Sequence, residues 1–104
     1  MPQFDVHENR GKTRTGFPFL VVVQSDEFPG TINTLVVPVT HLTGAYPDYA
    51  PGFDFQGARY IADALGLFPI PTSRLGPVIG SLAEDASSSA IITAIDRVVS
   101  TACA

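Results

Sequence analysis

The sequence predicts a small, mainly β fold with one C-terminal α-helix. Two valine-rich apolar runs, 17–24 and 33–39, have the β-branched composition of buried strands. After Pro77 the chain contains no further proline, and residues 91, 95 and 98 place isoleucine and valine at helical spacing. Several short strands followed by one helix fit a small antiparallel sheet or barrel with the helix packed on it.

The first half of the chain predicts three strands. Residues 3–7 alternate apolar Phe4 and Val6 with polar neighbours, which is typical of a half-buried strand. The run 17–24 is almost continuously apolar and is therefore predicted to be central. In the run 33–39, Pro38 has no N–H to donate, so we expect it at an edge, a bend or a bulge.

The second half predicts a hairpin, extended segments and the helix. Residues 53–63 indicate a hairpin with its turn at Gln56–Gly57. Two prolines within 65–76 favour short strands over a helix, and 77–82 fits either a last strand or a short helical turn. We expect the helix from about Ser88 to Val99, capped by Asp85 or by the serines at 87–89.

Composition limits the kind of function. The 104 residues form a single predicted domain, residues 1–104, with a net charge of −4 and only 15% charged residues. Sparse charge favours an oligomer or a surface that a partner covers, and negative charge argues against direct nucleic-acid binding. Three basic residues, Arg10, Lys12 and Arg14, are interpreted as a solvated turn rather than a phosphate site.

The sequence predicts no catalytic site, metal site or cofactor. One cysteine, Cys103, and two distant histidines cannot make a standard zinc site. His7 and His41 are interpreted as ordinary polar residues at strand ends. Ser25 and Asp26 are expected to bond to local backbone amides in a turn. The N-terminus lacks a signal-peptide core and no apolar run has membrane-spanning length, so we expect a cytoplasmic protein with no membrane contact.

Five stretches in order resemble the CcdB family of bacterial toxins from type II toxin–antitoxin modules. They are "QFDV", "FLVVVQSD", "TLVVPV", "IPTSRLG" and the terminal "AIITAID". The spacing of "VQSD" before "VP" is the most specific of these features. The resemblance covers nearly the whole chain, and it implies an SH3-like β-barrel of the CcdB/MazF type, with a C-terminal helix, that forms a homodimer.

The resemblance also implies an activity and partners. Toxins of this family bind the GyrA subunit of DNA gyrase, trap the enzyme on cleaved DNA and have no catalytic site of their own. A CcdA-like antitoxin neutralises them with a disordered segment, and the complex represses its operon. The antitoxin is expected to dock on a groove that overlaps the target-binding face.

The same resemblance implies the target- and antitoxin-binding residues. It places them in the loop after "QSD" and at the end of the helix: Glu27, Phe28, Asp96, Val99, Ser100, Thr101 and Ala102. Phe28 fits either an exposed interface anchor or a plug that closes one end of the barrel. Gyrase-poisoning members end their helix in a tryptophan–glycine–isoleucine type of motif. This chain has no tryptophan, so fold, dimerisation and antitoxin binding follow from the resemblance better than gyrase poisoning does.

Two other functions fit the sequence. One is a non-toxic regulatory dimer that binds an antitoxin and controls its operon. The other is a MazF-like messenger-RNA endonuclease on the same barrel, for which His7, Arg10 and Arg14 are the available acid–base and cationic groups. The acidic chain and the lack of a matching opening motif argue against the endonuclease.

Overall fold

Seven strands, two short 3₁₀ turns and one helix make up the described part of the chain. The computed structural model describes residues 2–44, 47 and 49–100, the last with its backbone only. In order, the elements are β1 (Asp5–Glu8), β2 (Phe19–Val22), β3 (Asn33–His41), β4 (Gly52–Phe55), β5 (Ala58–Ala62), η1 (Ala64–Gly66), β6 (Phe68–Pro71), η2 (Thr72–Arg74), β7 (Val78–Ser81) and α1 (Ala86–Ser100). The mainly β fold with one C-terminal helix is confirmed, and Cys103 lies outside the described residues.

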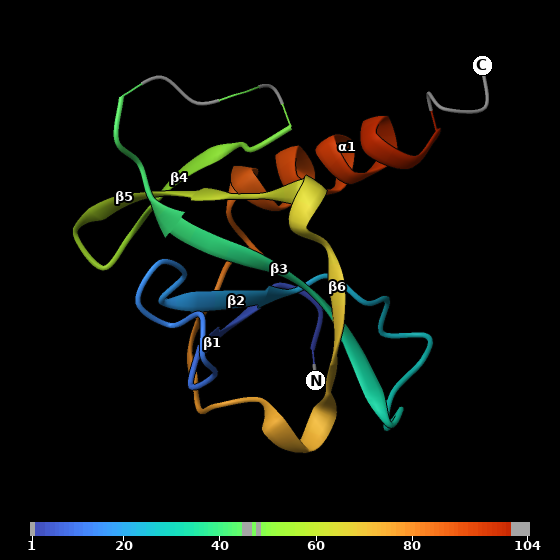
Figure 1. Cartoon of the computed structure of the whole chain (residues 1–104). Helices are drawn as coiled ribbons and strands as arrows, with labels where there is room; N and C mark the ends of the chain where they lie inside the picture. Colours follow the sequence, from blue (N-terminus) through green and yellow to red (C-terminus); the bar gives the residue numbers. More distant parts are fainter. Residues whose placement is uncertain (1, 45–46, 48, 101–104) are drawn as a thin grey trace.

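The strands form one antiparallel sheet that curls into a half-barrel (Figure 1). Its strand order is β4-β5-β3-β2-β1-β7. The remaining strand, β6, lies outside this linear order and pairs with β3. The long strand β3 changes partner along one edge: residues 33–36 pair with β6, and residues 39–41 pair with β5. The predicted central position of β2 is confirmed, because β1 and β3 pair with it on either side.

Pro38 lies in a central strand rather than at an edge, a bend or a bulge. It is opposite Leu20 of β2, and its carbonyl accepts a hydrogen bond from the Asp63 N–H at 2.9 Å. The N–H and C=O of a strand residue point to the same side, so the missing N–H faces the gap where β3 passes from β6 to β5. No ladder hydrogen bond is lost there, which explains why proline is tolerated.

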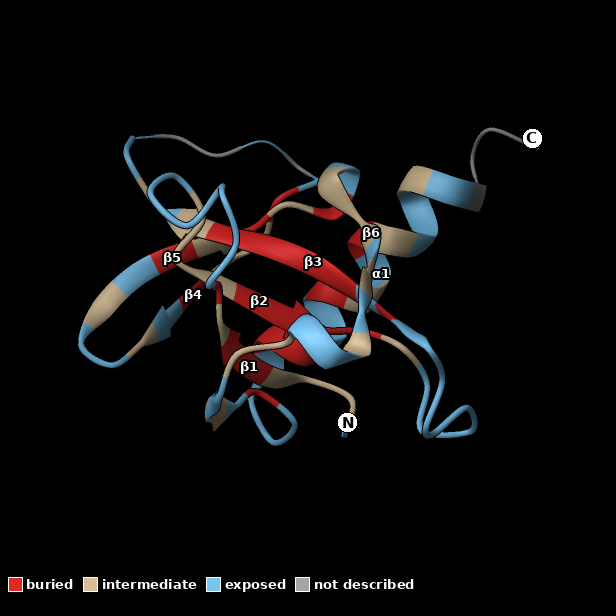
Figure 2. Cartoon of the chain, turned by 60° about the horizontal axis from the view of Figure 1, so that its bottom comes forward, coloured by how far each residue is buried: buried red, intermediate tan, exposed pale blue. Residues whose placement is uncertain are grey.

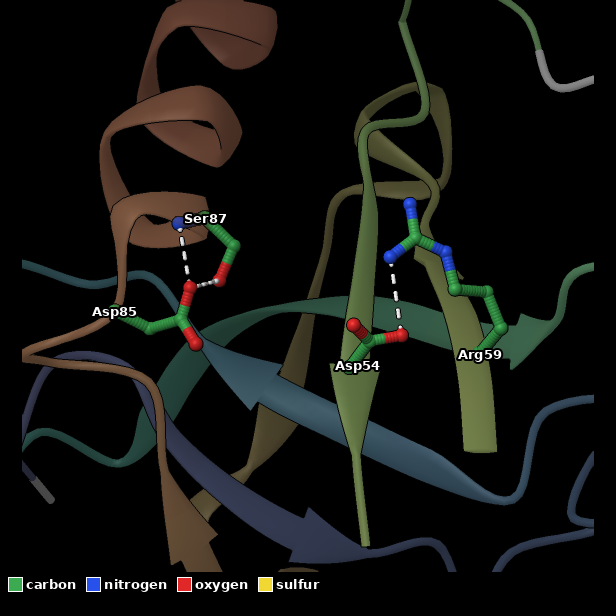
Figure 3. Close-up of polar contacts among 4 residues, drawn as sticks. All are labelled: Asp54, Arg59, Asp85 and Ser87. Atoms are coloured by element: carbon green, nitrogen blue, oxygen red, sulfur yellow. Dashed lines mark hydrogen bonds and ion pairs between the residues drawn. The ribbon is translucent and has the colours of Figure 1, made fainter. Parts of the chain in front are cut away.

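The predicted hairpin turn is confirmed between β4 and β5. Gln56 and Gly57 both have positive φ, 50° and 79°. Two such residues make the type I′ turn, whose twist matches that of the flanking strands. Across this hairpin, Arg59 Nη1 lies 3.0 Å from Asp54 Oδ1 (Figure 3).

Both faces of the curled sheet are covered, and buried residues concentrate on β2 and β3 (Figure 2). One face carries the main core, under α1 and the β4–β5 hairpin. Its buried members are Val6, Val21, Val23, Val37, Val39, Phe53, Tyr60, Ala62, Leu82 and Ile91. The other face carries a second core of Leu20, Val22 and Val36, against which Phe68, Ile70 and Leu75 pack.

Asp85 caps the helix, as the sequence predicts, and the helix begins at Ala86, two residues before the expected Ser88. The carboxylate oxygen Oδ1 of Asp85 accepts hydrogen bonds from the Ser87 N–H at 2.9 Å and from the Ser87 hydroxyl at 2.8 Å (Figure 3). These two hydrogen bonds hold the pKa of Asp85 below its ordinary value, and the bond from the Ser87 N–H has the larger effect. The carboxylate form is therefore favoured in the folded state.

Replacing Asp85 with alanine is expected to lower the free energy of unfolding by about 1 kcal/mol, because the Ser87 N–H in the first helical turn loses its partner. The effect should depend on pH. A lowered pKa in the folded state means that the stabilisation is present at neutral pH and is lost as pH falls through the folded-state pKa. Urea unfolding at neutral and acidic pH measures this. Asp85→Asn, which keeps an acceptor oxygen but carries no charge, serves as the control, and a stability of Asp85→Asn equal to that of the native chain at neutral pH would contradict a charge contribution.

Candidate functional site

The loop between β2 and β3 is organised by the side chain of Gln24. Its Nε2 donates to the Phe28 carbonyl at 2.7 Å and to the Thr31 hydroxyl at 2.8 Å. Its Oε1 accepts from the Leu35 N–H at 3.1 Å, at the start of β3. One amide group therefore joins both ends of the ten-residue loop.

The loop is also tied to the N-terminal segment. Asp26 Oδ1 accepts a hydrogen bond from the Gln3 N–H at 2.8 Å, and Gln3 Nε2 donates to the Val23 carbonyl at 3.0 Å. The prediction that Asp26 bonds to a local amide is therefore wrong, because its partner, Gln3, belongs to the N-terminal segment just before β1. Ser25 does behave as predicted: its hydroxyl accepts from the Glu27 N–H at 3.2 Å.

Phe28 projects from this braced loop with 61% of its surface exposed. That exposure excludes the plug interpretation. Ile32 is 87% exposed and Leu35 is 37% exposed, so three apolar side chains from one segment face solvent. We call Phe28, Ile32 and Leu35 the loop patch. Glu27 is exposed beside it.

The helix end, residues 96–100, is the second expected contact region. Asp96 is exposed and Val99 is 51% exposed. The side chain of Ser100, together with Thr101 and Ala102, lies outside the described residues. Leu65 of η1 adds a 59% exposed apolar side chain on the element that packs against α1.

The structure does not bring the loop patch and the helix end together. The loop before β3 and the C-terminal end of α1 are separated in Figures 1 and 2, although both lie toward the same side of the molecule. A partner that contacts both must therefore span the face between them. Sequence reasoning missed Ile32, Leu35 and Leu65, and the only signal for Ile32 is a lone isoleucine among polar loop residues.

The histidines and arginines considered for catalysis do not assemble into an exposed site. His7 is only 2% exposed, and its Nδ1 lies 2.8 Å from the Gly76 carbonyl. Its Nε2 is buried without a hydrogen-bond partner in the described part of the chain. His7 does lie near the end of β1, as expected, but its side chain is buried and not at the surface as an ordinary polar residue would be. His41 does lie exposed at the end of β3, with its ring 4.7 Å from that of Tyr60.

Among residues 2–44, 47 and 49–100, no group of three or more His, Cys, Asp or Glu side chains is placed to hold a metal ion. In that same part of the chain, no helix combines the length and apolarity needed to cross a bilayer.

Two solved structures share this curled sheet and C-terminal helix. An endoribonuclease from a mycobacterial species, solved in complex with its cognate antitoxin, has a TM-score of 0.79 and 16% identity, over 96% of this chain and 95% of that one. The Mycobacterium tuberculosis toxin MazF-mt6 has a TM-score of 0.63 and 20% identity, over 89% and 93%. At these identities the likeness establishes the fold. No curated protein sequence matches the chain.

The fold class is thus one that toxins of toxin–antitoxin modules use. The sequence itself specifies the family: the family model described as CcdB protein matches residues 3–101. The chain belongs to the CcdB family.

Proposed function

We propose that this chain is the toxin component of a type II toxin–antitoxin module and acts by binding protein partners. Membership of the CcdB family supports a toxin, and the mycobacterial neighbour that was solved with its cognate antitoxin supports an antitoxin partner. The observation that carries the binding mechanism is Phe28, an aromatic side chain 61% exposed on a loop held by Gln24 and Asp26. A rigid loop loses little conformational entropy when its aromatic residue binds a partner.

The proposed contact surface consists of the loop patch with Glu27, and of the helix end with Asp96 and Val99. Ser100, Thr101 and Ala102 extend it along the chain. A CcdA-like antitoxin would dock across the same face and so compete with the target. A second copy of the chain completes the functional unit as a homodimer, and the GyrA subunit of DNA gyrase is the target to test first.

An endonuclease is the second candidate, because the neighbour with a TM-score of 0.79 is an endoribonuclease. The burial of His7 argues against a site built from His7, Arg10 and Arg14, since a buried imidazole cannot reach a phosphate on the surface. A regulatory dimer without toxicity uses the same antitoxin surface. Assays of growth, DNA cleavage and RNA cleavage separate these functions.

Induced expression in a bacterial host is expected to arrest growth, and co-expression of a CcdA-like antitoxin is expected to restore it. Purified protein added to gyrase should produce trapped, linear DNA if GyrA is the target. RNA cleavage by the purified protein without gyrase would contradict action by binding. Binding of the antitoxin without growth arrest would support the regulatory dimer instead.

Phe28→Ala tests the anchor. Loss of a buried aromatic contact at an interface commonly costs about 2 kcal/mol, so partner affinity should fall about thirtyfold. Because Phe28 is exposed in the free protein, the thermal midpoint should hardly change. Val78→Ala is the matched control, since Val78 is also an exposed apolar residue, at 53%, but lies on β7. Full toxicity and unchanged affinity in Phe28→Ala would refute the anchor.

A further inference from the structure

A groove of about 400 Å³ lies between the β1–β2 connection and β6. Arg10 and Gly11 line one side, and Phe68–Pro71 with Arg74 line the other. We call it the β6 groove. It contains none of the residues of the loop patch or the helix end, although its lining residue Pro69 is the cross-strand neighbour of Leu35, so the groove adjoins the loop patch.

The floor of the β6 groove is apolar and supported from below. Phe68 and Ile70 are half-buried and pack against the second core beneath β6. Such side chains keep fixed positions while still presenting apolar surface to a ligand. Apolar ligand side chains are therefore expected to bind between them.

The free edge of β6 cannot accept an added strand. Pro69 and Pro71 lie opposite Leu35 and Asn33 of β3, and both prolines are exposed. Ile70, between the two prolines, pairs with Thr34, so the backbone nitrogens of Pro69 and Pro71 face away from β3. A strand added at this edge would need N–H groups there, and proline has none. A ligand in this groove must therefore be recognised by its side chains rather than by strand addition.

Four of the six basic residues of this acidic chain belong to the segments that form the groove. Arg10, Lys12 and Arg14 come from the β1–β2 connection, and Arg14 Nη1 donates to the Gly11 carbonyl at 3.1 Å. Arg74 comes from η2 and makes no ion pair with any residue that the structure describes. Segments distant in sequence thus bring positive charge to one apolar groove.

Glu8 supplies a carboxylate beside Arg10, one of the arginines of the groove. Glu8 Oε2 lies 3.7 Å from Arg10 Nη2, and the two side chains are 47% and 65% exposed. A solvent-exposed pair at that separation contributes little, about 0–1 kcal/mol. A ligand carboxylate can therefore replace Glu8 as the partner of Arg10.

We propose that the β6 groove binds an acidic peptide segment that also carries bulky apolar side chains. The arginines at its two sides bind carboxylates, and the floor formed by Phe68 and Ile70 takes the apolar residues. A nucleic acid matches the local positive charge but not this apolar floor. If the proposed function holds, the segment belongs to the antitoxin, which then contacts a surface outside the target-binding face.

The experiment measures binding of a fluorescent peptide of about 12 residues that alternates glutamate with leucine and phenylalanine. The full chain should bind it, and the double variant Arg10→Glu/Arg74→Glu should bind at least tenfold more weakly. Raising salt should weaken binding by the native chain more than by the variant. Arg59→Glu is the control for a charge reversal outside the groove, because Arg59 lies on the β4–β5 hairpin beside Asp54, and its affinity should equal that of the native chain.

Three results would overturn the groove assignment: no binding of the acidic peptide, equal binding by the double variant, or equal binding of a peptide with lysine in place of glutamate. Loss of binding to a single-stranded RNA probe in the double variant, with peptide binding intact, would make it a nucleic-acid site. These failures are distinguishable from failure of the proposed function. A toxic, antitoxin-neutralised protein that ignores the peptide refutes the groove alone, whereas peptide binding without toxicity or neutralisation refutes the toxin role alone.

Discussion

Replacing Ile91 with alanine is expected to lower the free energy of unfolding by about 3–4 kcal/mol. Ile91 is 1% exposed and belongs to the main core, so it holds α1 against the curled sheet. Removing its side chain leaves a cavity. The strands cannot close it, because the valines of the main core that face α1 come from three strands that are fixed by their pairing with one another. The loss should therefore exceed the transfer free energy of the deleted methyl and methylene groups.

Ile92→Ala is the matched control for this substitution. Ile92 is the next residue on α1 and is only half-buried, so the same deletion should cost about 1 kcal/mol. Urea unfolding at one fixed protein concentration, followed by circular dichroism, measures both variants. Equal losses would show that α1 is not anchored through the face that carries Ile91. The helix end would then lack the rigid support that the proposed contact surface requires.

Gly76→Ala is expected to destabilise the protein by about 2–3 kcal/mol. A Cβ at this position would overlap the Glu8 carbonyl oxygen, which is part of the backbone and cannot rotate away. Gly76 and Glu8 approach closely because hydrogen bonds join the segment after η2 to β1. The Gly76 carbonyl lies 2.8 Å from His7 Nδ1, and the Glu8 N–H donates to the Pro77 carbonyl at 3.0 Å.

Gly16→Ala provides the comparison, since no atom lies within 4 Å of the Cβ that it would add. Its stability should stay within about 0.5 kcal/mol of the native chain. Thermal unfolding of the two variants measures the global loss of stability. The peptide-binding assay at low temperature shows whether the substitution also changes the β6 groove locally. A thermal midpoint for Gly76→Ala equal to that of Gly16→Ala would mean that β1 and the segment after η2 do not approach as closely as described.

The loop patch and the β6 groove show how far the candidate surfaces were predictable. The resemblance placed Glu27 and Phe28 in the loop after β2, but only the structure shows that Phe28 is exposed, because the side chain of Gln24 and the carboxylate of Asp26 brace the loop. Nothing local in the sequence joins Arg10 to Arg74. Their proximity arises because the chain from β6 through η2 returns toward β1 (Figure 1).

By itself, the sequence determined the elements whose causes are local. Valine-rich runs made β2 and β3, the Gln56–Gly57 pair made a type I′ turn, and Asp85 with the apolar face around Ile91 made a capped helix. Local patterns suffice for these because neighbouring residues supply the side-chain period, the φ preferences and the cap.

Tertiary structure alone decided how residues distant in sequence share one environment. It set Pro38 against the gap between β5 and β6, buried His7 under the segment that carries Gly76, and separated the loop patch from the helix end. These outcomes depend on the direction in which a sheet of this order curls. That direction is set by packing among all the strands and the helix together, so no short stretch of sequence contains it.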